Sequence, residues 1–432
     1  MVSIDGGREH TGSYYAASRN LRSDYPQLKG DHRCDVVVVG GGFSGVSTTL
    51  FLAERGYDVT LVEANRISWG ASGRNGGQLI DGFTDTEKFR KKFGDSVANM
   101  VWQMGVECRD IVVDRIEKYS IDCDLKFGYL DVAGRGRPAE LRGLEAHLED
   151  RIKHNFPYEM RMVGPEELGE WINTDAYVAG LSNQGNGHLH PLNLCVGEAR
   201  AASELGATIF EQTRVTRIQH GDKPFVETEF GKVFANKVVL AGNAYLRDAE
   251  PRLRNAVFPA GSYIIATEPL GEERANALLP ADVAFCEQCT ALNYFRLSQD
   301  KRLLFGGMCN YSGRHPRNIT ASLMPRLLKV FPSLAGIRID YEWGGNIAIS
   351  INRCPQFGRI KGNTYYVQGY SGHGVAPTHL AGKMLADIVC GDSEQFDVFS
   401  KINHMSIPGG KWFAGPAVAL GMSYFRLKEM LS

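Results

Sequence analysis

The sequence lacks an excess of either charge and contains no long hydrophobic run. Its 48 Lys and Arg residues stand against 49 Asp and Glu residues, so the formal net charge is −1 at pH 7. This balance gives no long-range attraction for nucleic acid, and no nucleic-acid partner is expected. No stretch of about 18 apolar residues occurs, which predicts no membrane span. Residues 1–12 are polar and lack the apolar stretch of a signal peptide.

Cysteines are few, odd in number and irregularly spaced. The nine cysteines favour reduced thiols in a cytoplasmic protein over a disulfide framework. Cys286 and Cys289 form the one C-x-x-C pair, but no second pair follows at zinc spacing. His188 and His190 lack an evident third ligand and would face opposite ways on a strand. We therefore expect structural thiols and no metal.

Both ends of the chain have α/β patterning. Residues 34–39 form a β-branched run that predicts a buried parallel strand. Residues 43–55 have helical character, Gly56 lies just past their end, and residues 58–63 read as a second strand. These elements form a strand–helix–strand unit of the expected size.

The rest of the chain predicts two interleaved domains, because antiparallel strands occupy the middle. Further helices are expected at 84–120, 137–155, 191–205, 322–331 and 377–390. Further strands are expected at 208–210, 215–219, 225–229, 237–241, 262–267, 294–298, 303–306, 337–343 and 365–368. The predicted dinucleotide domain comprises 30–84, 160–250 and 345–400, and the predicted substrate domain comprises 85–159 and 251–344. We expect residues 401–432 to pack on the body.

Residues 40–45 (GGGFSG) match the G-x-G-x-x-G pattern of a dinucleotide-binding turn. Gly40 permits the tight turn, Gly42 lets the backbone approach a pyrophosphate, and Gly45 lets helix and strand pack closely. The pyrophosphate would rest at the helix N-terminus. Glu63 ends the second strand, where its carboxylate can accept hydrogen bonds from ribose hydroxyls. The pattern does not separate FAD from NAD.

Two further glycine-rich segments favour FAD. Residues 69–78 (WGASGRNGGQ) suit a loop wrapped against a ligand. Residues 368–377 (QGYSGHGVAP) repeat the order of strand, glycine-rich turn and helix. A helix N-terminus aimed at the flavin N1–C2=O edge would stabilise negative charge on reduced flavin. His373 either points there or is a structural turn residue.

The segments GGGFSG, WGASGRNGGQ and GYSGHG resemble the D-amino-acid-oxidase class of FAD enzymes, which includes glycine oxidase and monomeric sarcosine oxidase. The resemblance covers essentially the whole chain. It implies an α/β fold in which a glutathione-reductase-type Rossmann domain that binds FAD is interleaved with an antiparallel-sheet α+β substrate domain. The FAD would be bound non-covalently by Gly40, Gly42, Phe43, Ser44, Gly45, Glu63, Ala64, Asn65, Ala71, Ser72, Gly73, Arg74, Asn75, Gly76, Gly77, Gln78, Val215, Ala241, Gly242, Gly345, Gly372, His373, Gly374, Val375 and Ala376.

The activity that the resemblance implies is oxidation of an amine C–N bond. Hydride would pass to flavin N5, the imine product would be hydrolysed, and O₂ would reoxidise the flavin to give H₂O₂. The implied substrate is an amine or amino acid, most specifically a γ-glutamyl-polyamine. Two alternatives stay open: a dehydrogenase that passes electrons to a quinone or carrier, and a flavin-binding protein without turnover.

The chain departs from the sarcosine-oxidase pattern at the residues that lie over the flavin. Sarcosine-type relatives carry a Lys and a His over the flavin, and this chain has Leu304 and Met308 near those places. A second Lys of those relatives holds the substrate carboxylate, and this chain has Ala376 near that place. This favours an amine whose anionic end lies farther out. Arg353 and Arg296 are candidates for binding such a carboxylate, because an arginine offers a bidentate fork. The alternative for each is a structural ion pair.

No general base stands out, because flavin chemistry needs few side chains. A pocket with aromatic walls would lower the pKa of the substrate amine by desolvation. Tyr263, Tyr294, Phe295 and Trp343 are candidates to line it, or else form core packing. The side chains predicted at the reacting centre are therefore His373, Arg353, Tyr263 and Trp343.

Overall fold

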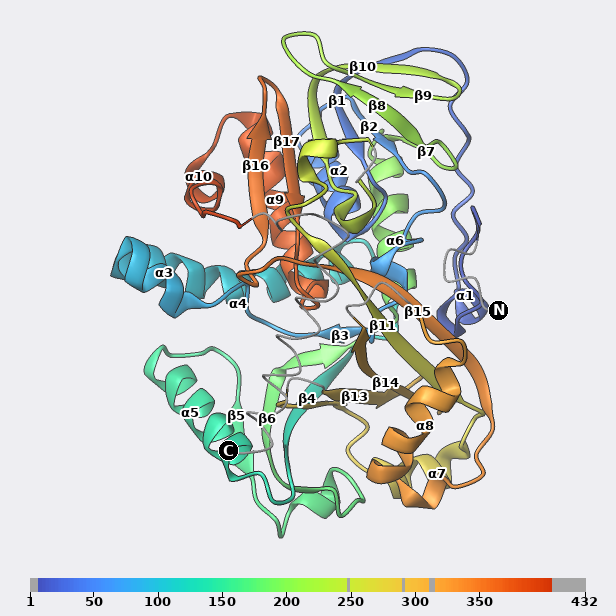
Figure 1. Ribbon diagram of the computed structural model, residues 1–432, viewed down its shortest axis with the longest axis vertical. Coiled ribbons are helices and arrows are strands. Elements are labelled where there is room, and N and C mark those ends of the chain that lie inside the picture. The colour runs from blue at the N-terminus through green and yellow to red at the C-terminus, as the bar shows by residue number, and fades with distance from the viewer. Residues whose placement is uncertain (1–6, 247–248, 290–291, 311–314, 406–432) are drawn as a thin grey trace.

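The computed structural model describes residues 7–246, 249–289, 292–310 and 315–405, and it contains two large sheets (Figure 1). The first sheet has the strand order β16-β17-β10-β1-β2-β7, and β9 joins β8 to β10. Its strands are β1 (His32–Val39), β2 (Val59–Val62), β7 (Thr208–Phe210), β8 (Val215–Gln219), β9 (Phe225–Thr228), β10 (Gly231–Leu240), β16 (Gln356–Ile360) and β17 (Thr364–Gln368).

The centre of the first sheet is parallel, as the β-branched patterning predicts. β1 pairs in parallel with β2 and β10, and Val36 to Val39 are buried. The helices α2 (Phe43–Glu54), α6 (Pro191–Glu204) and α9 (Val375–Cys390) pack into the adjoining core. α2 and α9 approach closely, since a Cβ at Gly382 would lie 2.5 Å from Ser47 Oγ.

The second sheet is mostly antiparallel and has the strand order β15-β11-β14-β13-β12-β4-β6-β3, with β5 paired to β6. Only β12 and β4 pair in parallel among its described strands. The strands are β3 (Gln78–Leu79), β4 (Lys126–Gly134), β5 (Met160–Val163), β6 (Tyr177–His188), β11 (Phe258–Thr267), β12 (Ala284–Glu287), β13 (Asn293–Leu297), β14 (Leu303–Asn310) and β15 (Ile339–Ile349).

The two faces of the second sheet bury their side chains in different cores. Ile264 and Trp343 point toward the first sheet and its helices. Ile265 and Phe305 point into a separate core with α8 (Ile319–Val330) and α7 (Gly271–Leu278). This alternation follows the two-residue period of a strand, so strand register decides which side chains can face the dinucleotide-binding half.

The remaining elements lie around these sheets. α10 (Glu394–Ser400) buries Phe396 and Phe399 against Phe357 of β16. Other helices are α1 (Tyr14–Ser18) and α5 (Pro138–Lys153). Short 3-10 turns are η1 (Ala71–Gly73), η2 (Leu168–Glu170), η3 (Asn243–Tyr245), η4 (Pro251–Leu253) and η5 (Pro332–Leu334).

Several details differ from the sequence expectations. β5 and β6 pair within the second sheet, although residues 160–250 were assigned to the dinucleotide domain. Strands at 126–134, 177–188, 284–287 and 356–360 were not predicted. The domain limits themselves remain a prediction. Residues 406–432 of the predicted C-terminal segment lie outside the described residues.

The predicted helix over 84–120 is two helices, α3 (Thr86–Phe93) and α4 (Asp95–Lys118). They meet at Gly94, whose φ of +86° and ψ of +179° only glycine adopts without strain. All nine cysteines are free thiols. In the described part of the chain, no helix is long and apolar enough to cross a membrane.

We expect Gly94→Ala to destabilise the protein by roughly 1–3 kcal/mol, because alanine is strained in this conformation. Gly143→Ala is the matched control. Gly143 lies in α5 with open space around it, and alanine should stabilise that helix by about 0.5–1 kcal/mol. Thermal unfolding midpoints of both variants should therefore move in opposite directions. If Gly94→Ala unfolded at or above the wild-type temperature, the break between α3 and α4 at Gly94 would be contradicted.

Candidate cofactor-binding site

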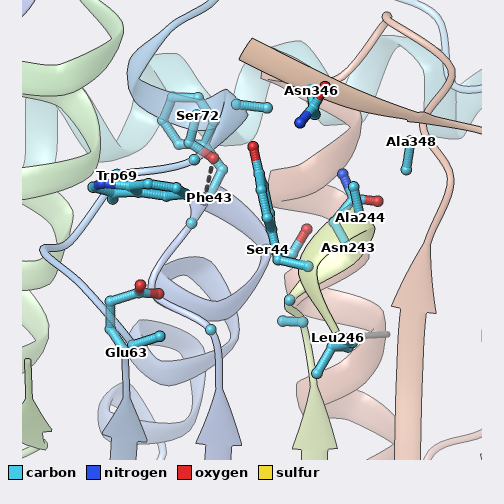
Figure 2. Close-up of a pocket in the computed structure, with 18 of the residues that line it drawn as sticks. Phe43, Ser44, Glu63, Trp69, Ser72, Asn243, Ala244, Leu246, Asn346 and Ala348 are labelled. Atoms are coloured by element: carbon cyan, nitrogen blue, oxygen red, sulfur yellow. Dashed lines mark hydrogen bonds between the residues drawn. The ribbon is translucent and has the colours of Figure 1, made fainter. Parts of the chain in front are cut away.

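A cavity of about 760 Å³ lies at the carboxyl ends of β1, β2 and β10. Val39, Val62 and Ala241 line it at these three strand ends. The volume falls within the usual range of small-molecule sites. Ligands in open parallel sheets bind at this edge, so the sheet topology places the cavity where a dinucleotide belongs (Figure 2).

The turn between β1 and α2 leaves no room for side chains. Gly40 has φ +113°, and a Cβ there would lie 2.9 Å from the Ala241 carbonyl group. A Cβ at Gly45 would lie 1.8 Å from the Gly40 oxygen. At the cavity, the Phe43 N–H donates to Ser72 Oγ over 2.9 Å, the dashed contact in Figure 2. The backbone and the N-terminus of α2 thus form a cradle that suits a diphosphate.

Glu63 lies just past β2, at the far end of this cradle. Its carboxylate accepts the N–H groups of Gly41 at 2.6 Å and of Asn65 at 2.8 Å. Desolvation by burial raises the pKa of Glu63, and these two backbone donors oppose that rise. The donors fix the carboxylate at the cavity wall, where the remaining lone pairs can accept ribose hydroxyls.

The opposite end of the cavity lies at the glycine-rich turn before α9. Gly372, Gly374 and Val375 line it there, and Gly372 has φ +95°. The Tyr370 hydroxyl and Ser44 Oγ are 2.6 Å apart, which joins this turn to α2. Burial raises the pKa of Tyr370. The positive end of the α9 dipole therefore meets the cavity, which suits a group that becomes anionic.

The glycine-rich loop after Trp69 is held from behind by Arg74. The Arg74 Nε donates to the Trp69 carbonyl over 2.8 Å, and the guanidinium carbon lies 4.3 Å from the centroid of the Trp69 ring. The Trp343 indole N–H donates to the Arg74 carbonyl over 3.0 Å. Arg74 thus orders the wall instead of facing the cavity.

The segment 7–9 crosses the cavity rim. Gly7 and Arg8 line the cavity, and Glu9 anchors the segment. The Glu9 carboxylate accepts Arg66 Nε at 3.0 Å and Gln212 Nε2 at 2.9 Å. The Trp69 indole N–H donates to the Glu9 carbonyl at 2.9 Å. The sequence patterns did not point to this segment, because its role depends on contacts that are distant along the chain.

The cavity gathers much of the predicted cofactor set. The predicted residues that line it are Gly40, Gly42, Phe43, Ser44, Glu63, Ala64, Asn65, Ala71, Ser72, Asn75, Val215, Ala241, Gly242, Gly372, Gly374 and Val375. Predicted residues that do not line it are Gly45, Gly73, Arg74, Gly76, Gly77, Gln78, Gly345, His373 and Ala376. Several of the latter lie directly behind the wall, as Gly45 and Arg74 do.

The four side chains predicted at the reacting centre do not line this cavity. His373 Nε2 hydrogen-bonds with the Gly82 carbonyl over 2.8 Å, which ties two loops together. Arg353 is exposed in a turn with φ +58°. Tyr263 is buried in the core beneath α8, and Trp343 is buried in the core around α2 and α9. Phe295 shares the core of Tyr263, whereas Tyr294 faces the glycine-rich loop.

Arg296, the other predicted carboxylate ligand, is buried and its donors are occupied. Its guanidinium donates to the carbonyls of Gly76 and Leu189, each over 2.8 Å, and to the Tyr15 hydroxyl over 3.2 Å. These contacts join α1, the glycine-rich loop and β13. Arg296 is therefore a structural cation and not a free fork for substrate. His190 accepts the Asn193 N–H as the N-cap of α6.

Sequence reasoning missed several cavity residues because they come from elements that were not assigned to the site. β15 contributes Asn346 and Ala348, and the turn after β10 contributes Asn243 (Figure 2). Tyr370 lies inside the GYSGHG segment and could have been included from that pattern. The full set of missed residues is Gly7, Arg8, Val39, Val62, Trp69, Gly70, Arg214, Asn243, Ala244, Tyr245, Leu246, Ala249, Pro259, Asn346, Ile347, Ala348, Tyr370, Ser371 and Thr378.

Comparison with known proteins places this geometry in context. The family described as FAD dependent oxidoreductase (DAO) matches residues 35–388. Gamma-glutamylputrescine oxidoreductase of Escherichia coli is 42% identical over 427 residues, covering 98% of this chain and 99% of that protein. A probable oxidoreductase, OrdL, of Haemophilus influenzae is 38% identical over 430 residues, covering 98% of each chain.

Solved structures share the fold. Glycine oxidase from Bacillus cereus superposes with a TM-score of 0.69 at 20% identity, covering 86% of this chain and 99% of that one. L-proline dehydrogenase from P. horikoshii gives a TM-score of 0.70 at 22% identity, covering 86% and 98%. The two-sheet fold predicted from the sequence is therefore confirmed, and the cofactor is FAD.

We expect Gly42→Val to abolish FAD retention. A Cβ at Gly42 would lie 2.9 Å from Ser72 Oγ, and the larger side chain would enter the diphosphate cradle. Gly12→Val is the matched control, because open space surrounds Gly12. The purified control should be yellow and the Gly42 variant colourless. A fully yellow Gly42→Val protein would place the cradle elsewhere.

The segment 7–9 gives a second prediction. Glu9→Ala removes the carboxylate that accepts Arg66 and Gln212, so the segment should lose its anchor and FAD should dissociate more readily. Titration of apoprotein, followed by quenching of flavin fluorescence, should show a Kd raised several-fold. Glu229→Ala, at a turn between β9 and β10, serves as the control. An unchanged Kd for Glu9→Ala would show that the segment does not contribute to retention.

Proposed function

The chain belongs to the DAO family of FAD-dependent oxidoreductases, and on that basis we propose that it oxidises a C–N bond of an amine or amino acid. The observation that carries this proposal is the 42% identity with gamma-glutamylputrescine oxidoreductase along nearly the full length of both chains. A γ-glutamyl-polyamine is therefore the first substrate to test.

The protein contributes placement and electrostatics to this reaction. FAD, when bound, supplies the acceptor for the hydride that leaves the carbon beside the nitrogen. The N-terminus of α9 offers a positive dipole end to the cavity, which favours added negative charge there. Desolvation of the bound substrate would lower the pKa of its amine and favour the neutral form, which can release hydride.

We propose that the substrate approaches from the second sheet at Tyr294. A Cβ at Gly76 would lie 2.7 Å from Tyr294 Cε2, so this ring packs directly on the glycine-rich loop. The preceding residue, Asn75, lines the cavity. Ser262 Oγ and the Tyr294 hydroxyl are 3.4 Å apart, which places polar atoms on the same face. Tyr294 would thus contact the reacting end of the amine.

The electron acceptor is proposed as O₂, with H₂O₂ as the product. An oxidase and a dehydrogenase both share this fold, so the fold alone does not select the acceptor. The alternative is a dehydrogenase that passes its electrons to a quinone or carrier. The remaining possibility is a flavin-binding protein without turnover. We also propose a cytoplasmic location, on the basis of nine unpaired cysteines.

Anaerobic addition of γ-glutamylputrescine should bleach the visible absorbance of the oxidised flavin, because hydride transfer reduces it. Admission of air should restore the colour within seconds if O₂ is the acceptor. Bleaching that persists in air and is reversed by a quinone would support the dehydrogenase alternative. If a panel of amines and amino acids never bleaches the flavin, the proposed oxidation is wrong.

A further inference from the structure

Four paired positions form a row across the side of the second sheet on which Tyr294 lies. Gly306 of β14 pairs with Tyr294 of β13, Tyr294 pairs with Cys286 of β12, and Cys286 pairs with Asp131 of β4. A Cβ at Gly306 would lie 2.2 Å from the Tyr294 ring, so this ring covers Gly306 on the side toward Gly76. Directly paired residues share a face of a sheet, so Asp131 is on the same side as Tyr294.

The row sets the distance between Asp131 and the proposed reacting end. Neighbouring strands are about 4.8 Å apart, so Asp131 lies two strands, roughly 10 Å, from Tyr294. Tyr129, Cys286 and Tyr294 are in one apolar cluster on this face, with Ile80 and Leu292. Between Tyr294 and Asp131 the row therefore runs beside this cluster, and Asp131 is the first carboxylate along it.

Asp131 is a carboxylate whose printed hydrogen bond comes from a neutral donor. Gln288 Nε2, a neutral donor, lies 2.5 Å from Asp131 Oδ1, and in the described part of the chain no lysine or arginine forms an ion pair with Asp131. Burial raises the pKa of Asp131 to about 7. The hydrogen bond from Gln288 and the more distant charge of Arg151 oppose this rise, and nearby Asp81 adds to it. A partly exposed carboxylate of this kind gains most from a cation.

Asp81 shows the contrast. Asp81 is buried, and Arg151 of α5 reaches its Oδ2 at 2.6 Å, so that charge is already neutralised within the protein. Arg151 also donates to His147 over 2.9 Å. The two carboxylates therefore differ in their partners: Asp81 joins α5 to the loop after β3 by an ion pair, whereas Asp131 accepts from the neutral Gln288.

We propose that Asp131 binds a second, distal ammonium group of the substrate, and so selects amines that carry a cation roughly 10 Å from the oxidised carbon. This rests on the proposed amine oxidation. In γ-glutamylputrescine, about nine bonds separate the terminal carbon from the α-ammonium nitrogen. Nine bonds are the length of about three residues of extended backbone, which span roughly 10 Å. This length matches the distance across two strands from Tyr294 to Asp131.

The experiment compares three putrescine derivatives under anaerobic conditions. γ-Glutamylputrescine carries a distal ammonium and a carboxylate, glutarylputrescine carries only the carboxylate, and N-acetylputrescine carries neither. Wild-type protein should bind γ-glutamylputrescine about tenfold more tightly than glutarylputrescine, the value of one charge-assisted hydrogen bond. Asp131→Asn should remove that preference by weakening the binding of γ-glutamylputrescine alone.

Controls separate binding from folding. Asp131→Asn keeps the shape of the side chain, and Asp131→Glu should restore part of the preference. Asp175→Asn removes an exposed carboxylate 4.0 Å from Arg135 and should leave the preference intact. The proposal would be overturned if Asp131→Asn weakened the binding of all three ligands equally. It would also be overturned if the wild-type protein bound γ-glutamylputrescine no more tightly than glutarylputrescine.

Binding is also read as a perturbation of the oxidised flavin spectrum, which needs no turnover. If γ-glutamylputrescine perturbs the spectrum but never bleaches it, the proposed oxidation fails while the Asp131 comparison still stands. If another amine is the one oxidised, the comparison is repeated with that amine and its analogue lacking the distal ammonium. Failure of the function and failure of the Asp131 assignment thus give different results.

The same carboxylate predicts a pH dependence of stability. The groups that face Asp131 are Cys286 on β12, Tyr129 on β4, Asp81 and, from α5, Arg151. The pKa of Asp131 is about 7 in the folded protein and 3.8 ordinarily, so the folded state binds its proton more tightly. The resulting contribution to the free energy of unfolding is complete below pH 3.8 and is lost as the pH rises through 7. The thermal midpoint of Asp131→Asn, relative to wild type, should therefore rise from pH 5 to pH 8. A difference in thermal midpoint between variant and wild type that does not change with pH would contradict the raised pKa of Asp131.

Discussion

The close backbone contact between the first strand–helix turn and the end of β10 is the constraint on which the rest of the site depends. Gly40 and Gly45 leave no side chain between β1, α2 and Ala241, so strand ends and helix N-terminus meet at one edge. That contact produces both the cavity and the exposed positive end of α2. Every other wall, from the glycine-rich loop to the turn before α9, encloses space that this contact creates.

Two buried arginines show how the second sheet is fixed against that edge. Arg74 stacks on Trp69, and its carbonyl accepts the indole of Trp343. Arg296 donates to Gly76 and to Tyr15, so the N-terminal helix, the glycine-rich loop and β13 share one cation. Neither arginine lines the cofactor cavity. In contrast, the Asp131 carboxylate on the same side of the sheet accepts from one neutral donor. Our proposal therefore assigns recognition of the substrate's distal ammonium group to this carboxylate.

The sequence predicted what depends on local patterns. The residues 40–45, Glu63 and the segment around Gly372 lie close together in the structure because each motif fixes its own turn. Tyr263 lies on the strand face turned away from the cavity, and that face depends on register, which single-sequence patterns do not set. Arg296 lies on the face toward the glycine-rich loop, where contacts distant along the chain occupy its donors. His373 and Arg353 depend on loop contacts, and β15 was assigned too short to bring Asn346 to the cavity. Such long-range placement has no local signal.

Hydrogen–deuterium exchange of apoprotein against FAD-loaded protein tests the central claim most directly. Amides in 40–45, 69–75 and 370–375 should become protected when FAD binds, because these segments form the cavity wall. The separate, larger cavity around Arg135 and Lys329 should show no change. Protection there, with none in the three glycine-rich segments, would contradict the account.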